Sequence, residues 1–80
     1  MKAKVKVVLK PGILDPQGKA VLHAIRELGY KNIADIRIGK FIEIEVAPNK
    51  SKKIQEEVDE ICKKLLANPV MEKYQIEYEE

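Results

Sequence analysis

The stretch that decides how this chain folds reads KPGILDPQG and covers residues 10–18. Asp15 is placed to cap a helix, because its carboxylate can accept a hydrogen bond from an N–H of the first turn. Pro16 follows at the first helical position, where its missing N–H costs nothing and its φ is already helical. Gly18 falls inside that turn, where glycine costs up to about 1 kcal/mol relative to alanine. Either a backbone or a ligand approaches Gly18 closely, or the stretch is only a tight strand-to-helix connection.

A strand is expected before this stretch and a helix after it. Residues 2–9 alternate between apolar side chains on one face and mostly lysines on the other, which is typical of a half-buried strand. The helix is expected from Pro16 to about Leu28, followed by Gly29 in the left-handed conformation. Inward side chains of the strand are Val5, Val7 and Leu9, and the apolar stripe of the helix is Val21, Ala24, Ile25 and Leu28.

Two further strands are expected at residues 32–38 and from about residue 41 to residue 46, with a turn at Gly39-Lys40. A two-residue loop would mix the apolar and polar faces of these strands, because a shift of one residue turns every side chain to the other face. We therefore predict a loop of three or five residues, or a bulge, between them. In that arrangement the apolar side chains of the two strands lie together: Ile36, Ile38, Ile42 and Ile44.

The rest of the chain completes a familiar order of elements. A second helix is expected to about Ala67, with Asn49 or Ser51 as its cap, and a last strand alternates through Tyr74, Ile76 and Tyr78. The order β-α-β-β-α-β predicts an α+β, ferredoxin-like sandwich. Its antiparallel sheet has the strand order 4-1-3-2, with two helices on one face. Eighty residues form a single domain, residues 1–80.

Charge is unevenly distributed along the chain. Residues 1–40 carry a net charge of +6 and residues 41–80 a net charge of −4, which together give the net +2 of the chain. The predicted strand order accounts for this without any ligand, because it places basic side chains of the first strand between acidic neighbours. Such pairs stabilise a sheet by about 0.2–1 kcal/mol each. The expected groups are Lys4 and Lys6 between Glu43 and Glu45 on one side and Glu77 and Glu79 on the other.

The sequence contains no recognisable set of catalytic or metal-binding residues. The one histidine, His23, lies beside the helical stripe and is expected at a surface or interface, and Cys62 is expected to be buried. Neither GxGxxG nor GxxxxGK[ST] occurs, so no nucleotide site is predicted. RNA binding is disfavoured, because only Phe41 offers an aromatic ring on the open sheet face. A small phosphatase of this fold needs an arginine in the first loop, which has none. No apolar run approaches the roughly 20 residues of a membrane span, and with no secretory signal we expect a cytoplasmic protein.

Four blocks in this sequence resemble the PurS family, the small subunit of multi-subunit phosphoribosylformylglycinamidine synthase. The resemblance covers essentially the whole chain, with the blocks in the family's order and spacing. They are KPGILDPQG with Ala20-Val21, then Leu28-Gly29, then Arg37-Ile38-Gly39-Lys40, then Asn68 to Tyr74. The resemblance implies a non-catalytic subunit that joins the synthetase, PurL, to the glutaminase, PurQ, and that pairs with itself as a dimer or tetramer. ATP and magnesium would be used by the complex, with no cofactor, nucleic acid or membrane bound by this chain.

Candidate contacts with partners follow from position in the fold. The helix start and the hairpin end are the two segments that we expect to meet a partner, with Arg37 alternatively pairing across strands with Glu43. The candidate residues are Asp15, Pro16, Gln17, Gly18, Arg37, Gly39 and Lys40. A free-standing regulatory module that binds a small molecule at the loop after the first strand remains the alternative.

Overall fold

The structure is a computed structural model that describes residues 1–47 and 53–80. The expected helix caps Asn49 and Ser51 lie outside the described residues. The elements in order are β1 (Lys2–Leu9), α1 (Pro16–Glu27), β2 (Lys40–Glu45), α2 (Ile54–Ile61), a π-helical turn η1 (Cys62–Leu66) and β3 (Glu72–Glu79). The α+β class is confirmed, and β1, α1 and β3 lie within two residues of where the sequence predicts them.

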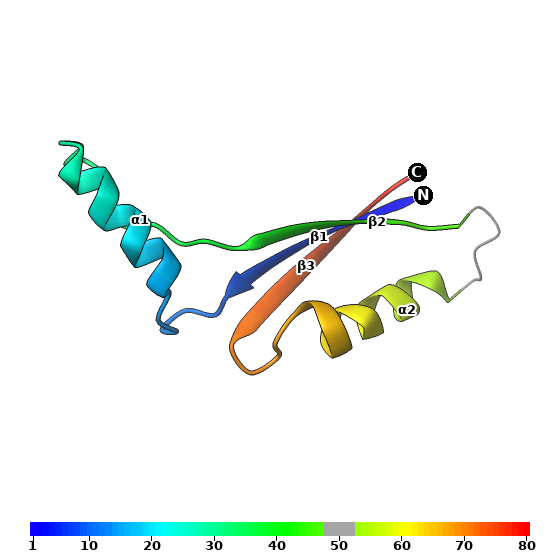
Figure 1. Ribbon diagram of the computed structural model, residues 1–80. Helices are drawn as coiled ribbons and strands as arrows, with labels where there is room; N and C mark the ends of the chain where they lie inside the picture. Colours follow the sequence, from blue (N-terminus) through cyan, green and yellow to red (C-terminus); the bar gives the residue numbers. More distant parts are fainter. Residues whose placement is uncertain (48–52) are drawn as a thin grey trace.

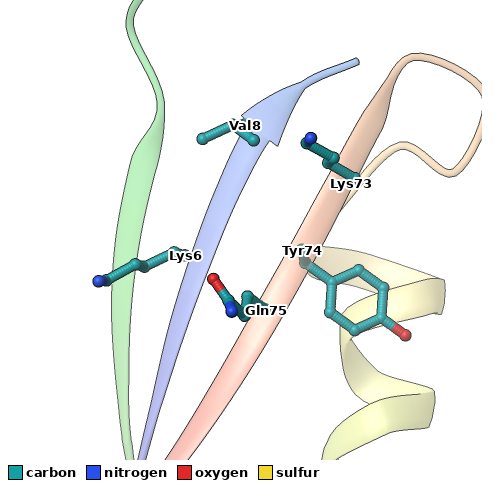
Figure 2. A pocket seen from close by; sticks show the side chains of 5 residues that line it. All are labelled: Lys6, Val8, Lys73, Tyr74 and Gln75. Atoms are coloured by element: carbon teal, nitrogen blue, oxygen red, sulfur yellow. The ribbon is translucent and has the colours of Figure 1, made fainter. Parts of the chain in front are cut away.

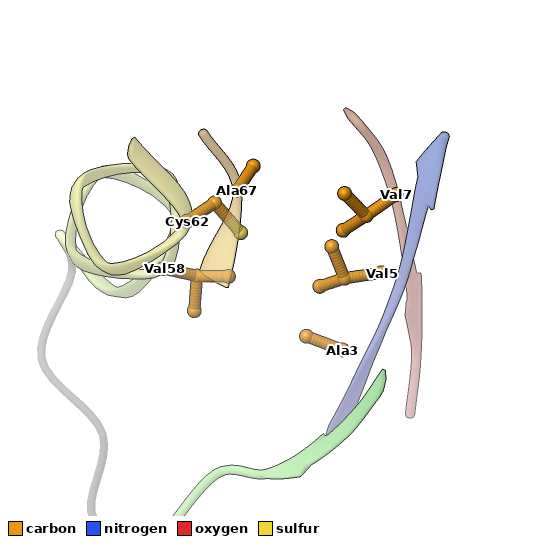
Figure 3. Packing of buried hydrophobic residues seen from close by; sticks show 6 residues of the cluster. All are labelled: Ala3, Val5, Val7, Val58, Cys62 and Ala67. Atoms are coloured by element: carbon orange, nitrogen blue, oxygen red, sulfur yellow. The ribbon is translucent and has the colours of Figure 1, made fainter. Parts of the chain in front are cut away.

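The three strands form one antiparallel sheet in the order β2-β1-β3. The central strand is β1, so its backbone is hydrogen-bonded on both sides (Figure 1). Helix α2 lies along one face of the sheet. Figure 3 shows the core between them, which consists of Ala3, Val5 and Val7 from β1 facing Val58, Cys62 and Ala67. The expected burial of Cys62 is confirmed.

The strand expected at residues 32–38 does not form. Among the described residues they have no strand partner, and after α1 the chain turns back beside the helix and continues into β2 (Figure 1). The turn expected at Gly39-Lys40 is therefore wrong as well. Gly39 does not have a positive φ. A Cβ there would lie 2.6 Å from the carbonyl oxygen of Val7, so the glycine serves the close approach of two backbones.

Helix α1 projects away from the sheet and covers neither face of it (Figure 1). The predicted pair of helices on one sheet face is therefore wrong for the single chain, and the order 4-1-3-2 is not completed. Most of the predicted apolar stripe is exposed, with Val21 at 39% and Leu28 at 75%. Leu22 is the buried apolar side chain of α1. An apolar helical face thus remains without a partner within residues 1–47 and 53–80.

The second helix changes its winding before it ends. The N–H of Ala67 donates to the carbonyl of Cys62 at 2.9 Å, five residues back, which is a π-helical bond. The wider turn keeps Cys62 and Ala67 in the core while Leu65 is 80% exposed.

The charged ladder across the sheet forms, but it involves Lys2 and Lys4 and so lies nearer the start of β1 than predicted. Lys2 contacts Glu43 at 2.8 Å and Glu45 at 3.4 Å, and Lys4 contacts Glu79 at 2.6 Å. Lys6 instead lies opposite Phe41 and Gln75. The expectation that glutamates flank Lys6 is therefore wrong, because the acidic residues of both neighbouring strands lie nearer the start of β1.

Candidate functional site

Asp15 joins the start of α1 to the segment that leads into β2. One carboxylate oxygen accepts the N–H of Gly18 at 2.9 Å, which confirms the predicted cap. The other oxygen accepts the N–H of Ile38 at 2.8 Å. The bond from Gly18, then that from Ile38, lowers the pKa of Asp15 below its usual value, against the opposing effect of burial. A buried carboxylate with both oxygens engaged is a structural fastener rather than a free acid or base.

Gly18 allows these two segments to meet. A Cβ on Gly18 would overlap the carbonyl oxygen of Ile36 and lie 2.5 Å from a carboxylate oxygen of Asp15. The close approach expected at this glycine is thus made by a backbone of the same chain. The structure gives a physical reason for a glycine in the first turn of a helix.

Arg37 also joins the segment that leads into β2 to the loop before α1. Its guanidinium donates to the carbonyl of Ile13 at 3.0 Å and to that of Lys10 at 3.2 Å. The alternative in which Arg37 pairs with Glu43 is wrong, because residue 37 does not lie in a hairpin with β2. We call residues 10–18 together with residues 35–40 the motif junction, since two of the sequence blocks meet there.

The block from Asn68 to Tyr74 adjoins the motif junction. The backbone N–H of Lys10 donates to the carbonyl of Met71 at 2.9 Å, and the ammonium of Lys10 donates to the carbonyl of Pro69 at 2.8 Å. Lys40 reaches the carbonyl of Leu66 at 3.2 Å and the carboxylate of Glu72 at 3.8 Å. Segments far apart in sequence therefore converge at the end of β1.

The seven predicted site residues fall into two groups at this place. Asp15 and Gly18 are buried and hold the junction together, whereas the other five are exposed: Pro16, Gln17, Arg37, Gly39 and Lys40. A shallow groove there is lined by Leu9, Asp15, Pro16, Gln17, Ile38, Gly39, Lys40 and Glu72. Within the described residues no group of three or more His, Cys, Asp or Glu is placed to hold a metal ion.

Two polar features lie outside the junction. His23 is exposed, as predicted, with Glu27 at 3.4 Å. The hydroxyl of Tyr74 donates to Asp59 at 2.5 Å, and this bond raises the pKa of Tyr74 to about 12. The same bond, with a contribution from Lys63, lowers the pKa of Asp59. Sequence reasoning missed this pair, because Tyr74 alternates like any core strand residue and nothing marks Asp59 as its partner.

Comparisons with known proteins agree with the resemblance. The family model described as "PurS: Phosphoribosylformylglycinamidine (FGAM) synthase" matches residues 2–80. The chain is 46% identical to the PurS subunit of Bacillus subtilis over 99% of this chain and 93% of that protein. It is 42% identical to the PurS subunit of Methanocaldococcus jannaschii over 98% of this chain and 94% of that protein.

Solved structures give the same result in three dimensions. The crystal structure of B. subtilis PurS matches with a TM-score of 0.91 at 48% identity, covering 99% of this chain and 98% of that one. A chain in the structure of PurLQS from Thermotoga maritima matches with a TM-score of 0.81 at 32% identity, covering 95% and 93%. The chain therefore belongs to the PurS family and is a subunit of phosphoribosylformylglycinamidine synthase.

Proposed function

We propose that this chain is the non-catalytic assembly subunit that holds a PurL-type synthetase and a PurQ-type glutaminase in register. The single observation that carries the proposal is the shape of the chain: α1 and the segment after it project beyond a small sheet, and apolar side chains of α1 are exposed. The structure of PurLQS from T. maritima supports it, because a chain of this fold occurs there within a named assembly.

The assembly would convert formylglycinamide ribonucleotide, glutamine and ATP into formylglycinamidine ribonucleotide, glutamate, ADP and phosphate, a step of purine synthesis. ATP and magnesium would act at the synthetase, and this chain would bind no cofactor. Ammonia released by the glutaminase must reach the synthetase, so correct alignment of the two subunits is itself a mechanistic role. We place the assembly in the cytoplasm. No helix in residues 1–47 and 53–80 is long and apolar enough to cross a membrane.

The chain would pair with a second copy through residues 32–38. These residues alternate as a strand does, yet they lead into β2 from beyond the end of the sheet instead of folding back on β2. If a second copy supplies the same segment to the free edge of β2, each sheet gains its fourth strand and the order 4-1-3-2 is completed. Such an exchange keeps the pairing that a closed hairpin would make, which is why swapping is a low-cost route to dimers.

Helix α1 would follow its segment onto the second copy. Its exposed apolar side chains, among them Val21 and Leu28, would then cover the part of the sheet face that α2 leaves open. An 80-residue chain buries little surface by itself, so association adds a core that one copy lacks. A tetramer would be a pair of such dimers.

The groove of the motif junction is the proposed contact with the larger subunits. Three exposed members of the predicted set that line this groove, Pro16, Gln17 and Lys40, would touch the partner. Asp15, Gly18, Gly39 and Arg37 would act indirectly, because they hold the two segments of the junction together.

The test is reconstitution from purified subunits of the same organism. Turnover is measured with glutamine and, separately, with ammonia, in the presence and absence of this chain. We expect the chain to be required for turnover with glutamine and to affect turnover with ammonia much less, because only glutamine needs the glutaminase to be aligned. Equal glutamine turnover without the chain would overturn the proposal.

Self-association is tested by light scattering on the chain alone. The wild type should have at least twice the mass of one chain, and a variant with Val21→Glu and Leu28→Glu should have the mass of a monomer. The control Arg26→Glu changes an exposed polar position of the same helix and should leave the mass unchanged. A monomeric wild type would contradict the proposed exchange.

A further inference from the structure

The sheet face opposite α2 is divided by charge along β1. Its first half holds Lys2 and Lys4 among four glutamates, so this half is negative overall although both lysines are paired. The second half holds Lys6 and Lys73, and no ion pair joins either lysine to a carboxylate among the described residues. The four glutamates of the first half are Glu43, Glu45, Glu77 and Glu79.

The positive half has an apolar middle. Across the strands Lys6 lies opposite Phe41 and Gln75, and Val8 lies opposite Lys73. We call these five residues the basic patch. In Figure 2 four of them lie around one hollow of the sheet face, while Tyr74 points to the other side toward α2. Phe41 is 54% exposed and Val8 is 41% exposed, so the patch offers apolar surface beside its two lysines.

We propose that the basic patch docks a protein surface of the synthase assembly that presents two carboxylates beside an apolar side chain. The proposal rests on the function proposed above, which supplies the protein partners. Lys6 and Lys73 stand diagonally across neighbouring strands, an arrangement that separates Cα atoms by about 7–8 Å. That spacing suits two carboxylates on one turn of a helix or on alternate positions of a strand.

The surroundings of the basic patch favour a protein over a phosphate ligand. Backbone N–H groups of β1 are engaged in the sheet, so none converge on the patch as they do in phosphate sites. Lysines alone act as point charges without the bidentate fork that fixes a phosphate. A long polyanion would also run into the glutamates of the neighbouring half. A partner surface with two separate carboxylates beside an apolar side chain fits both the two lysines and the exposed Phe41.

The test compares binding of the purified synthetase and glutaminase subunits to three forms of the full chain. The charge-reversed form carries Lys6→Glu and Lys73→Glu, and the conservative form carries arginine at both positions. The matched control carries Arg26→Glu and Lys64→Glu, which make the same change in net charge at exposed basic residues away from the basic patch and the motif junction. Circular dichroism and melting temperature establish that each form is folded, and the mass of each is measured without partners.

We expect the charge-reversed form to bind its partner at least tenfold more weakly, with most of the loss in the association rate. The arginine form and the matched control should bind as the wild type does. The difference should shrink at high salt, because exposed charges are screened beyond about 8–10 Å near physiological ionic strength.

Each other result decides against a specific statement. If the wild type binds neither subunit, the proposed function fails, and this inference fails with it. If the wild type and the charge-reversed form bind alike, the function stands and the inference is overturned.

Equal losses in the control would mean that net charge alone acts, and a change of mass in the charge-reversed chain alone would assign the patch to a second copy. Binding of ATP to the wild type that the charge reversal removes would assign it to a nucleotide. Each of these three results overturns the docking proposal.

Discussion

Replacing Gly18 with alanine should destabilise the chain, although helix propensity predicts the opposite. Gly18 lies in the first turn of α1, where the change from glycine to alanine would by itself gain up to about 1 kcal/mol. The added Cβ would overlap the carbonyl oxygen of Ile36 and lie 2.5 Å from an oxygen of Asp15. The Asp15 oxygen accepts the N–H of Ile38, two residues after the Ile36 carbonyl, so neither atom moves aside without loosening the junction.

The expected size follows from the two opposing effects. Forcing a methyl group into a packed site costs about 1–3 kcal/mol and occasionally more, and loosening the contacts of Asp15 would add to that cost. After subtraction of the helical gain, we expect a net loss of about 1–2 kcal/mol. In a chain of this size each kcal/mol corresponds to about 4–8 °C in melting temperature, so the variant should melt about 5–15 °C lower.

The assay is thermal and urea unfolding at one fixed protein concentration, because melting of a self-associating chain depends on concentration. Ala20→Gly is the matched control, since Ala20 is an exposed position of the same helix and should lose about 1 kcal/mol from propensity alone. Our reasoning predicts that both variants are destabilised. Propensity alone predicts opposite signs, so a higher melting temperature for Gly18→Ala would refute the role assigned to this glycine.

Gly39→Ala should also lower the free energy of unfolding, by about 1–3 kcal/mol, because its Cβ would lie 2.6 Å from the carbonyl oxygen of Val7. The urea midpoint should fall accordingly, and an unchanged midpoint would show that β2 can shift freely. The lowered pKa of Asp15 means that its contribution to stability is complete above its ordinary value of 3.8 and is lost as the pH falls through the lowered value. Asp15→Asn should therefore be less stable than the wild type at neutral pH and differ little from it in strong acid, and a constant difference across urea titrations would contradict this. The pKa of Tyr74, raised to about 12, implies a contribution that is complete below 10.0 and lost toward 12. Asp59→Asn should bring the Tyr74 transition in the tyrosinate absorbance to lower pH, and a transition that stays in place would exclude the hydrogen bond as its cause.

Local patterns predicted the elements that depend on local interactions. The cap at Asp15 and the left-handed Gly29 bound α1 as expected, and period-two alternation located β1 and β3. Each of these features depends on residues close in sequence, so the local sequence pattern is enough to predict it. The buried position of Cys62 followed from helical spacing in the same way.

The errors share a physical origin. Alternation in residues 32–38 is the same whether the strand pairs within its own chain or with another, so the sequence does not decide between these alternatives. Glycine before Lys40 is equally compatible with a turn and with a close backbone approach, and the structure has the second. The direction of α1 depends on which choice is made at Gly39. One ambiguous residue therefore separates a closed sandwich from a chain with a projecting helix.

The family motifs look different once their contacts are known. Most of the residues that mark the family bind other parts of the same chain: Asp15 holds Ile38, and Arg37 holds Lys10 and Ile13. An adaptor contributes geometry, so the groups that fix the angle between its parts matter as much as the groups that touch a partner. Changing Arg37 to alanine removes two exposed hydrogen bonds whose effect on stability is modest. The same change frees α1 to take other directions, so the proposed assembly should lose more from it than the fold does.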